Sequence, residues 1–267
     1  MNRTTEPAVQ TLEYCKIADE GHLRIVTVNR PEVMNALSSE ASHELEKVWN
    51  EFAERDDLWV GIVTGAGDRA FSAGNDLKLQ AAGKRGPRPH NGFGGLAHRF
   101  DLIKPVIAAV NGVAMGGGFE MALACDIIVA SENAVFALPE VRVGLIAAGG
   151  GVHRLPRVIP QKQAMGMILT GRRVSAKEGH ALGFVNEVVP VGEALNAARR
   201  WAAMILECSP MAVRASKEAV CRGFDEASLE TAVRNFYPAQ KANLESQDYI
   251  EGPRAFAEKR KPNWQNK

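Results

Sequence analysis

Residues 107–127 read IAAVNGVAMGGGFEMALACDI, and this stretch decides the fold expected for the chain. The apolar run Val106–Val110 overlaps its start and is typical of a strand buried on both faces. Glycines 116–118 then open a helical pattern with Glu120 in its first turn. A glycine run at a helix start leaves backbone N–H groups uncovered, where the helix dipole favours negative charge. The stretch therefore predicts a strand, a loop able to hold an oxyanion, and a helix carrying an acid.

The order of strand, loop and helix recurs along the first part of the chain. Apolar runs at residues 23–28, 58–64 and 127–130 predict further strands, and residues 39–55 show helical spacing after a possible cap at Ser38 or Ser39. After about residue 155 the patterns are mostly helical, at residues 161–169, 175–182, 192–207, 210–222 and 225–245, with one strand at 185–189. We predict an α/β fold whose catalytic groups lie in the first part, because the second part has no dense cluster of chemical residues.

Composition excludes several classes of function. The chain has 267 residues, 46% of them hydrophobic, and a formal net charge of +1, so no bulk attraction to nucleic acid or to an anionic membrane is expected. The four cysteines show no CxxC pairing and are expected to be reduced. No apolar run is long enough to span a bilayer, and the first seven residues do not resemble a signal peptide, which favours a cytoplasmic location. The six histidines lack metal-ligand spacing, and no GxSxG or P-loop motif is present.

Two glutamates stand out, and each has a second interpretation. Glu120 follows the glycine run, and Glu140 lies twenty positions further on in the sequence ALPE. Two acids next to uncovered N–H groups could act as general acid and general base on a carbonyl compound. Each feature alone has an ordinary structural explanation: the glycines could serve close helix packing, and the glutamates could be surface acids, with Arg142 a possible ion-pair partner for Glu140. Only their combination favours catalysis.

Residues 83–95 are rich in glycine and proline and predict a flexible loop after a short helix at residues 76–82. Its basic residues Lys84, Arg85 and Arg88 could face phosphates, but we favour a solvated loop.

Three segments together resemble the enoyl-CoA hydratase/isomerase (crotonase) family. The stretch at residues 107–127 resembles that family's signature, SAGNDL at residues 72–77 resembles its first oxyanion loop, and LPEVRVGL at residues 138–145 resembles its second acid loop. The likeness continues through residues 170–173, 181–186 and 251–260, so it covers nearly the whole chain. It implies a crotonase (ClpP-like) fold, with a core of repeated strand-strand-helix units at residues 1–195. A helical region at residues 196–267 would serve oligomerisation and contacts to CoA and the acyl chain.

The resemblance implies a role for each site residue. The N–H groups of Ala73 and Gly117 would form the oxyanion hole for a thioester carbonyl, and Glu120 and Glu140 would hold one water between them. Glu120 would deprotonate the water as it attacks the β-carbon, and Glu140 would protonate the α-carbon. Contacts to the CoA substrate would come from a wider set of residues: Val33, Met34, Ala73, Gly74, Asn75, Asp76, Leu77 and Gly117, with Phe256 and Lys259 reaching CoA on a neighbouring subunit.

The chain departs from the family pattern at two places. Glu32 stands where many relatives have a basic residue, which removes one expected phosphate partner. Ala147 and Ala148 stand where many have Pro-Gly, so the backbone near the catalytic water is expected to differ.

Because both glutamates are present, the resemblance favours an enoyl-CoA hydratase that adds water reversibly to a 2-enoyl-CoA. It implies no metal and no cofactor apart from the CoA of the substrate, and a homotrimer or a dimer of trimers. The alternatives within the fold are a carnitinyl-CoA (crotonobetainyl-CoA) dehydratase and an enoyl-CoA isomerase. A non-catalytic RNA-binding protein is disfavoured by the near-neutral charge and by the lack of a basic face interleaved with aromatic residues.

Overall fold

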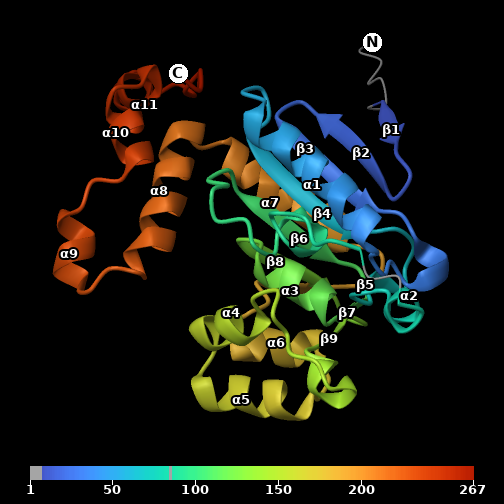
Figure 1. Ribbon diagram of the computed structural model, residues 1–267. Helices are drawn as coiled ribbons and strands as arrows, with labels where there is room; N and C mark the ends of the chain where they lie inside the picture. The colour runs from blue at the N-terminus through green and yellow to red at the C-terminus, as the bar shows by residue number, and fades with distance from the viewer. Residues whose placement is uncertain (1–7, 84–85) are drawn as a thin grey trace.

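The computed structural model describes residues 8–83 and 86–267, so Lys84 and Arg85 of the glycine-rich loop lie outside it. Two sheets and the helices around them make up the fold (Figure 1). The larger sheet has the order β1 (Val9–Thr11), β2 (Cys15–Glu20), β3 (Leu23–Val28), β4 (Val60–Gly65), β6 (Val106–Val110), β8 (Ile127–Ser131) and β11 (Glu187–Val189). The smaller sheet has the order β10 (Val174–Ser175), β9 (Val135–Ala137), β7 (Val113–Met115) and β5 (Ala70–Ser72).

The central strands of the larger sheet are buried on both faces, as their apolar sequences predict. From β3 to β11 the neighbouring strands are parallel, and their register aligns the strand residues in rows across the sheet. One row, with Val26, Val63 and Ala108, belongs to the core beneath α1 (Ser39–Glu54). The next row, with Ile25, Ile62 and Ile107, faces the opposite way, as successive residues of a strand must.

A helix covers each face of this sheet (Figure 1). Helix α1 is capped by the Ser38 side chain, which accepts from Ala41 N, and it buries Leu45, Trp49 and Phe52. On the other face lies α7 (Ala194–Leu206), whose buried positions are all alanines: Ala194, Ala197, Ala198 and Ala202. Small side chains let this helix lie close to the isoleucine row.

The two sheets are joined by a unit of strand, strand and helix that occurs three times. The units are β4, β5 and α2 (Leu77–Ala81), then β6, β7 and α3 (Gly117–Leu123), then β8, β9 and the 3-10 turn η3 (Pro139–Val143) with α4 (Gly151–Val158). In each unit the second strand enters the smaller sheet, where β5, β7 and β9 are parallel and only β10 is antiparallel to its neighbour. The segments that follow β5, β7 and β9 therefore leave neighbouring strands at one edge and converge there. The repeated strand-strand-helix core agrees with the prediction.

The remaining elements are mostly helical: η1 (Pro31–Val33), η2 (Phe93–Gly95), α5 (Gln161–Thr170), α6 (Ala176–Leu182), α8 (Pro210–Gly223), α9 (Leu229–Arg234), α10 (Pro238–Leu244) and α11 (Gln247–Ala257). The single helix predicted at residues 225–245 is wrong. Asn235 is extended, with ψ of 146°, and Pro238 starts α10 because a proline cannot continue a helix from the preceding turn. The predicted division between residues 195 and 196 falls within α7, and it stays a prediction.

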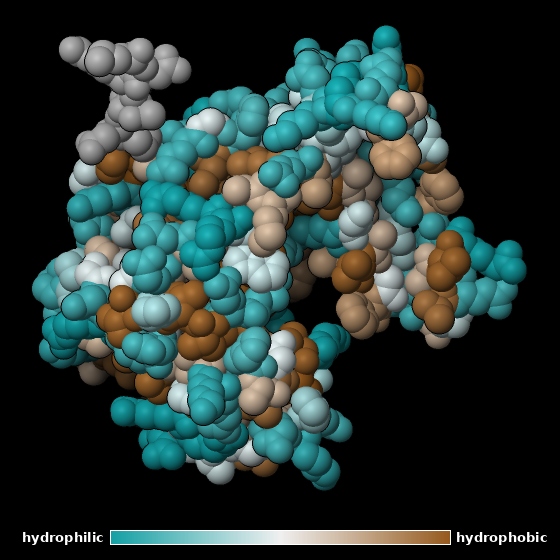
Figure 2. Space-filling view, turned by 180° about the vertical axis from the view of Figure 1, so that it is seen from behind, coloured by the Kyte–Doolittle hydropathy of each residue, from teal (hydrophilic) through white to brown (hydrophobic). Residues whose placement is uncertain are grey.

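Helices α8 to α11 form an arm that stands apart from the sheets (Figure 1). The arm exposes large apolar side chains: Val220, Phe224, Leu229 and Val233 are 61%, 78%, 80% and 74% exposed. Figure 2 shows a hollow between the arm and the body with apolar residues on its sides. Exposed apolar surface of this extent is typical of an association surface. No helix among the described residues is both long and apolar enough to cross a membrane.

Candidate active site

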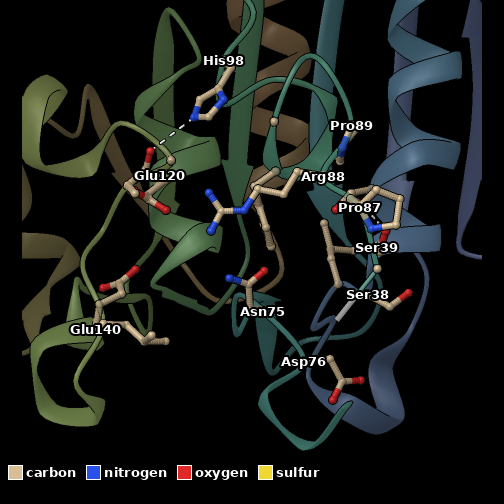
Figure 3. A pocket seen from close by; sticks show the side chains of 18 of the residues that line it. Ser38, Ser39, Asn75, Asp76, Pro87, Arg88, Pro89, His98, Glu120 and Glu140 are labelled. Atoms are coloured by element: carbon tan, nitrogen blue, oxygen red, sulfur yellow. Dashed lines mark hydrogen bonds between the residues drawn. The ribbon is translucent and has the colours of Figure 1, made fainter. Parts of the chain in front are cut away.

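A cavity of about 490 Å³ lies where the segments after β5, β7 and β9 converge. Both glutamates singled out from the sequence line it, together with Asn75, Asp76 and a wall from residues 86–98 (Figure 3). The chain thus brings together, from separate strand ends, the main groups that the sequence analysis placed in one site.

The glycine run at the start of α3 allows an unusually close approach of backbones. A Cβ on Gly118 would lie 2.2 Å from the carbonyl oxygen of Ser72, and one on Gly117 would lie 2.8 Å from the ring of Phe93. Any larger residue would push the helix start away from the loop after β5. The glycine run therefore does serve close packing of α3 on its neighbours, as the structural interpretation of the sequence proposed. The same packing holds the uncovered N–H groups at the start of α3 next to that loop. The two interpretations of the run are not exclusive.

Glu120 is held in place by backbone groups. Its residue is only 5% exposed, and its Oε1 accepts a hydrogen bond of 2.9 Å from Gly151 N at the start of α4. Burial raises the pKa of this carboxyl, while hydrogen bonds from the backbone of Gly151 and Gly149 act in the opposite direction. The N–H donors thus favour the ionised form against the larger effect of burial, and the net direction of the pKa is upward.

Glu140 is placed differently. It lies in η3, directly after β9, and its Oε2 is buried without a hydrogen-bond partner among the described residues. Its pKa is raised to about 7, mainly by burial; a backbone hydrogen bond opposes this rise and the charge of Glu120 adds to it. A carboxyl whose pKa lies near neutrality can both give and take a proton at physiological pH. Figure 3 shows both glutamates on the same side of the cavity.

The interpretation of these acids as surface ion pairs is excluded. Arg142, the proposed partner of Glu140, instead donates from Nε to the Thr170 carbonyl at 2.8 Å. Neither Glu120 nor Glu140 forms a salt bridge with any residue in the two described segments. Glycines surround them: a Cβ on Gly116 would lie 3.1 Å from Glu140 Oε1, and one on Gly149 would lie 2.5 Å from Glu120 Oε2. Because Gly116 and Gly149 have no side chains, the space next to both carboxylates stays open.

The predicted oxyanion donor at Ala73 needs correction. The N–H of Ala73 donates to the carbonyl of Met34 at 2.9 Å, which uses the one backbone donor of this residue. Asn75, two residues later, lines the cavity, and its N–H has no hydrogen-bond partner within residues 8–83 and 86–267. The intervening Gly74 has φ of +90°, and a Cβ on it would lie 3.1 Å from Gly117 N. Within the described residues, Asn75 N is therefore free in this loop, and Gly117 N is one of the unpartnered backbone donors at the start of α3.

The loop at residues 72–76 is fixed from both sides, which holds the Asn75 backbone in position. Buried Ser72 donates from Oγ to the Asn35 carbonyl at 2.9 Å and accepts from Gly74 N at 3.1 Å. Leu37 N donates to the Gly74 carbonyl at 2.9 Å, and Asp76 N donates to the Leu37 carbonyl at 3.1 Å.

The predicted CoA contacts divide into two groups. Asn75 and Asp76 line the cavity, and Asp76 lies 3.5 Å from Arg30 in an ion pair. The other predicted contacts are not among the described residues that line the cavity: Val33, Met34, Ala73, Gly74, Leu77, Gly117, Phe256 and Lys259. Phe256 is 87% exposed on α11, at the arm, so a contact of this residue with substrate needs another subunit. These CoA contacts remain predictions.

The departure at Ala147 and Ala148 lies on the loop that carries the hydrogen bonds to Glu120. Ala147 is buried, and Ala148 lines the cavity, where its carbonyl lies 3.3 Å from Nε2 of His98. Arg154 donates to the Gly149 carbonyl at 3.3 Å and to the Ala97 carbonyl at 2.7 Å. The side chains of His98 and Arg154 thus support this loop at Ala148 and Gly149. At Ala147 and Ala148 the resemblance leads one to expect Pro-Gly.

Two basic side chains of the wall were not recognised as site residues from the sequence. His98 and Arg88 both line the cavity, and Arg88 is at the same time exposed to solvent, as expected for its loop (Figure 3). The charge at His98 acts to lower the pKa of Glu120. The only signal for Arg88 was its position in a glycine-rich loop. Within the described residues, no group of three or more His, Cys, Asp or Glu side chains could hold a metal ion.

Comparison with known proteins gives consistent likenesses over nearly the whole chain. The family model described as enoyl-CoA hydratase/isomerase matches residues 19–267. The carnitinyl-CoA dehydratase of Proteus mirabilis (strain HI4320) is 43% identical over 260 residues, covering 94% of this chain and 98% of the relative. The carnitinyl-CoA dehydratase of Escherichia coli (strain K12) is 43% identical over 267 residues, covering 96% and 99%.

Solved structures give the same answer for the fold. An enoyl-CoA hydratase from Mycobacterium tuberculosis H37Rv superposes with a TM-score of 0.89 at 37% identity, covering 95% of this chain and 99% of that one. A carnitinyl-CoA hydratase from Mycobacterium avium superposes with a TM-score of 0.76 at 39% identity, covering 96% and 100%. These likenesses confirm the predicted crotonase fold.

Proposed function

Because the chain belongs to the enoyl-CoA hydratase/isomerase family, we propose that it adds water reversibly to the double bond of a 2-enoyl-CoA. The observation that carries this proposal is the pair Glu120 and Glu140, two carboxyls of raised pKa on one cavity. Addition of water needs one group to take a proton and another to give one, and a single acid would leave one of these steps without a protein group.

The thioester carbonyl is proposed to lie between the N–H groups of Asn75 and Gly117. Asn75 N belongs to the loop after β5 and Gly117 N to the start of α3, and Gly74 lets these two segments lie close together because it has no side chain. The two donors therefore need little rearrangement when the enolate forms. Loss of one such donor costs about 2.7–4 kcal/mol of transition-state stabilisation in other enzymes. Because both donors belong to the backbone, no side chain at these positions takes part in this stabilisation.

The environments of the two acids support separate duties in the hydration direction. Glu120, which accepts hydrogen bonds from the backbone, is the better candidate for the ionised base that takes a proton from water. Glu140, with a pKa of about 7 and an unpartnered oxygen, is the better candidate for the acid that protonates the α-carbon. In dehydration the roles reverse. The proposed chemistry requires no metal and no cofactor other than the CoA of the substrate.

Assembly into a trimer, or a dimer of trimers, is proposed as part of the same account. The exposed apolar side chains of α8 and α9 supply a surface for association, and the predicted contacts of Phe256 and Lys259 with CoA require a second copy of the chain.

A second candidate is carnitinyl-CoA dehydratase activity, because relatives 43% identical over nearly their whole length carry that name. It uses the same site and differs only in the acyl group. A panel of acyl-CoA substrates tests both candidates: crotonyl-CoA, longer 2-enoyl-CoAs and crotonobetainyl-CoA, followed by the loss of conjugated thioester absorbance and by product mass. Hydration of crotonyl-CoA supports the first candidate, exclusive use of crotonobetainyl-CoA supports the second, and double-bond migration without water gain contradicts both.

A further inference from the structure

Arg88 places a positive charge on the wall of the cavity. In Figure 3 its guanidinium extends from the loop after α2 toward the region between Glu120 and Asn75, and all three residues line the cavity. Among the described residues that form the wall, Arg88 is the only lysine or arginine. The guanidinium makes no hydrogen bond or salt bridge with residues 8–83 or 86–267.

The acids of the cavity have other partners or other duties. Asp76 is paired with Arg30 at 3.5 Å, and Glu120 accepts from Gly151 N at 2.9 Å. Glu140 lies within the proposed reaction site and has no cationic partner in the described part of the chain. Arg88 is therefore an exposed arginine whose five donors have no partner among the described residues, in a fork geometry that matches a carboxylate, on the wall of a substrate cavity.

We infer that the acyl group of the substrate carries a carboxylate, which Arg88 binds through its guanidinium while the thioester carbonyl lies on Asn75 N and Gly117 N. This inference rests on the proposed function and names its substrate class: a 2-enoyl-CoA, or the corresponding 3-hydroxyacyl-CoA, with an anionic acyl tail. An anion entering next to two carboxyl groups needs a compensating cation, and Arg88 supplies it. The chemistry at the double bond is unchanged.

The position of Arg88 favours the acyl tail over the CoA phosphates as the anion that it binds. The guanidinium extends toward the acids that would flank the double bond, whereas the phosphates of CoA are separated from the thioester by the whole pantetheine arm. A quaternary ammonium fits this wall poorly, because it would face a like charge. The lining contains only one benzene ring, that of Phe93, and an aromatic cage for such a cation needs several rings.

Binding of saturated acyl-CoAs tests the inference without turnover. Succinyl-CoA, glutaryl-CoA and adipyl-CoA are each compared by calorimetry with the neutral acyl-CoA of equal carbon number: butyryl-CoA, pentanoyl-CoA and hexanoyl-CoA. Free CoA and 4-trimethylaminobutyryl-CoA complete the set. The variant is Arg88→Gln, and the matched control is Arg173→Gln, which removes the same charge at an exposed position away from the cavity.

We expect at least one anionic ligand to bind about tenfold more tightly than its neutral counterpart, which is the usual scale for hydrogen bonds to a charged group. Arg88→Gln is expected to abolish that preference while leaving free CoA and the neutral ligands within about threefold, and Arg173→Gln is expected to keep it. Equal weakening of all ligands, including free CoA, would place the phosphates on Arg88 and overturn the inference. So would tighter binding of the neutral or cationic ligands to the wild type.

The proposed function and this inference can be refuted independently of each other. A wild type that prefers anionic ligands through Arg88 but hydrates no 2-enoyl-CoA upholds the anion site and refutes the hydratase. A wild type that hydrates crotonyl-CoA but shows no preference for anionic ligands upholds the hydratase and refutes the anion site.

Discussion

Replacement of Glu140 by glutamine tests the electrostatics of the site through the stability of the protein, independently of any substrate. The pKa of this carboxyl is raised from its ordinary value of 4.5 to about 7, mainly by burial. Each pKa unit corresponds to about 1.36 kcal/mol, so the full difference amounts to about 3.4 kcal/mol. Because the folded state binds the proton more tightly than the unfolded chain, the stabilisation is complete below pH 4.5 and is lost as the pH rises through about 7.

The assay is urea unfolding followed by tryptophan fluorescence, at one protein concentration, at pH 5 and pH 8. Between these values the linkage relation gives a loss of about 2.5 kcal/mol for the wild type from this group alone. Glutamine at position 140 does not titrate, so the variant does not show this loss. The unfolding free energy of Glu140→Gln minus that of the wild type should therefore be about 2.5 kcal/mol larger at pH 8 than at pH 5. Exposed Glu132→Gln is the control and should give no such gain. A constant difference between Glu140→Gln and wild type, within about 0.5 kcal/mol, would refute the raised pKa.

Three further outcomes follow from the same geometry. For hydration of crotonyl-CoA, kcat/KM should fall above about pH 7 as Glu140 loses its proton, and a profile that stays flat to pH 9 would contradict its role as acid. Gly149→Ala puts a Cβ 2.5 Å from Glu120 Oε2, so kcat should fall about 100-fold with an unchanged circular dichroism spectrum; wild-type turnover would contradict this placement of Glu120. Lys104 donates from Nζ to the carbonyls of Phe52 and Arg55 at the end of α1, at 2.8 and 2.6 Å. Lys104→Met leaves both carbonyls without this donor and should lower the unfolding free energy by about 2–3 kcal/mol. A loss below about 1 kcal/mol in urea unfolding would refute this.

The parts of the fold that could be predicted were those with a strong local pattern. The run Val106–Val110 is apolar throughout, and α1 has its serine cap and its helical spacing, so both were found with nearly correct ends. The helix break before Pro238 was missed because the charged and apolar residues on either side of it continue a helical pattern. The proline itself was the available signal.

The two acids of the site could be predicted from the sequence, whereas only one of its two proposed backbone oxyanion donors was predicted. Glu120 and Glu140 were identified because the glycine run and the strand ends limit where a catalytic acid can lie. Ala73 was a wrong choice for the free donor because its partner, the Met34 carbonyl, comes from a segment distant in sequence, and only the folded chain shows that contact. Arg88 was expected to be solvated, which is correct, but it was not assigned to the site, because a glycine-rich loop gives no periodicity from which to tell whether an exposed side chain borders a cavity.

The most direct test of the account is the turnover of crotonyl-CoA by wild type, Glu120→Gln and Glu140→Gln, measured through the loss of conjugated thioester absorbance. We expect the wild type to form the hydrated product. Each variant should lose about 10²–10⁴-fold in kcat with KM changed by only a few fold, because each removes a proton-transfer group and leaves the backbone donors in place. Wild-type kcat in either variant would contradict the claim that the two carboxyls share the addition of water.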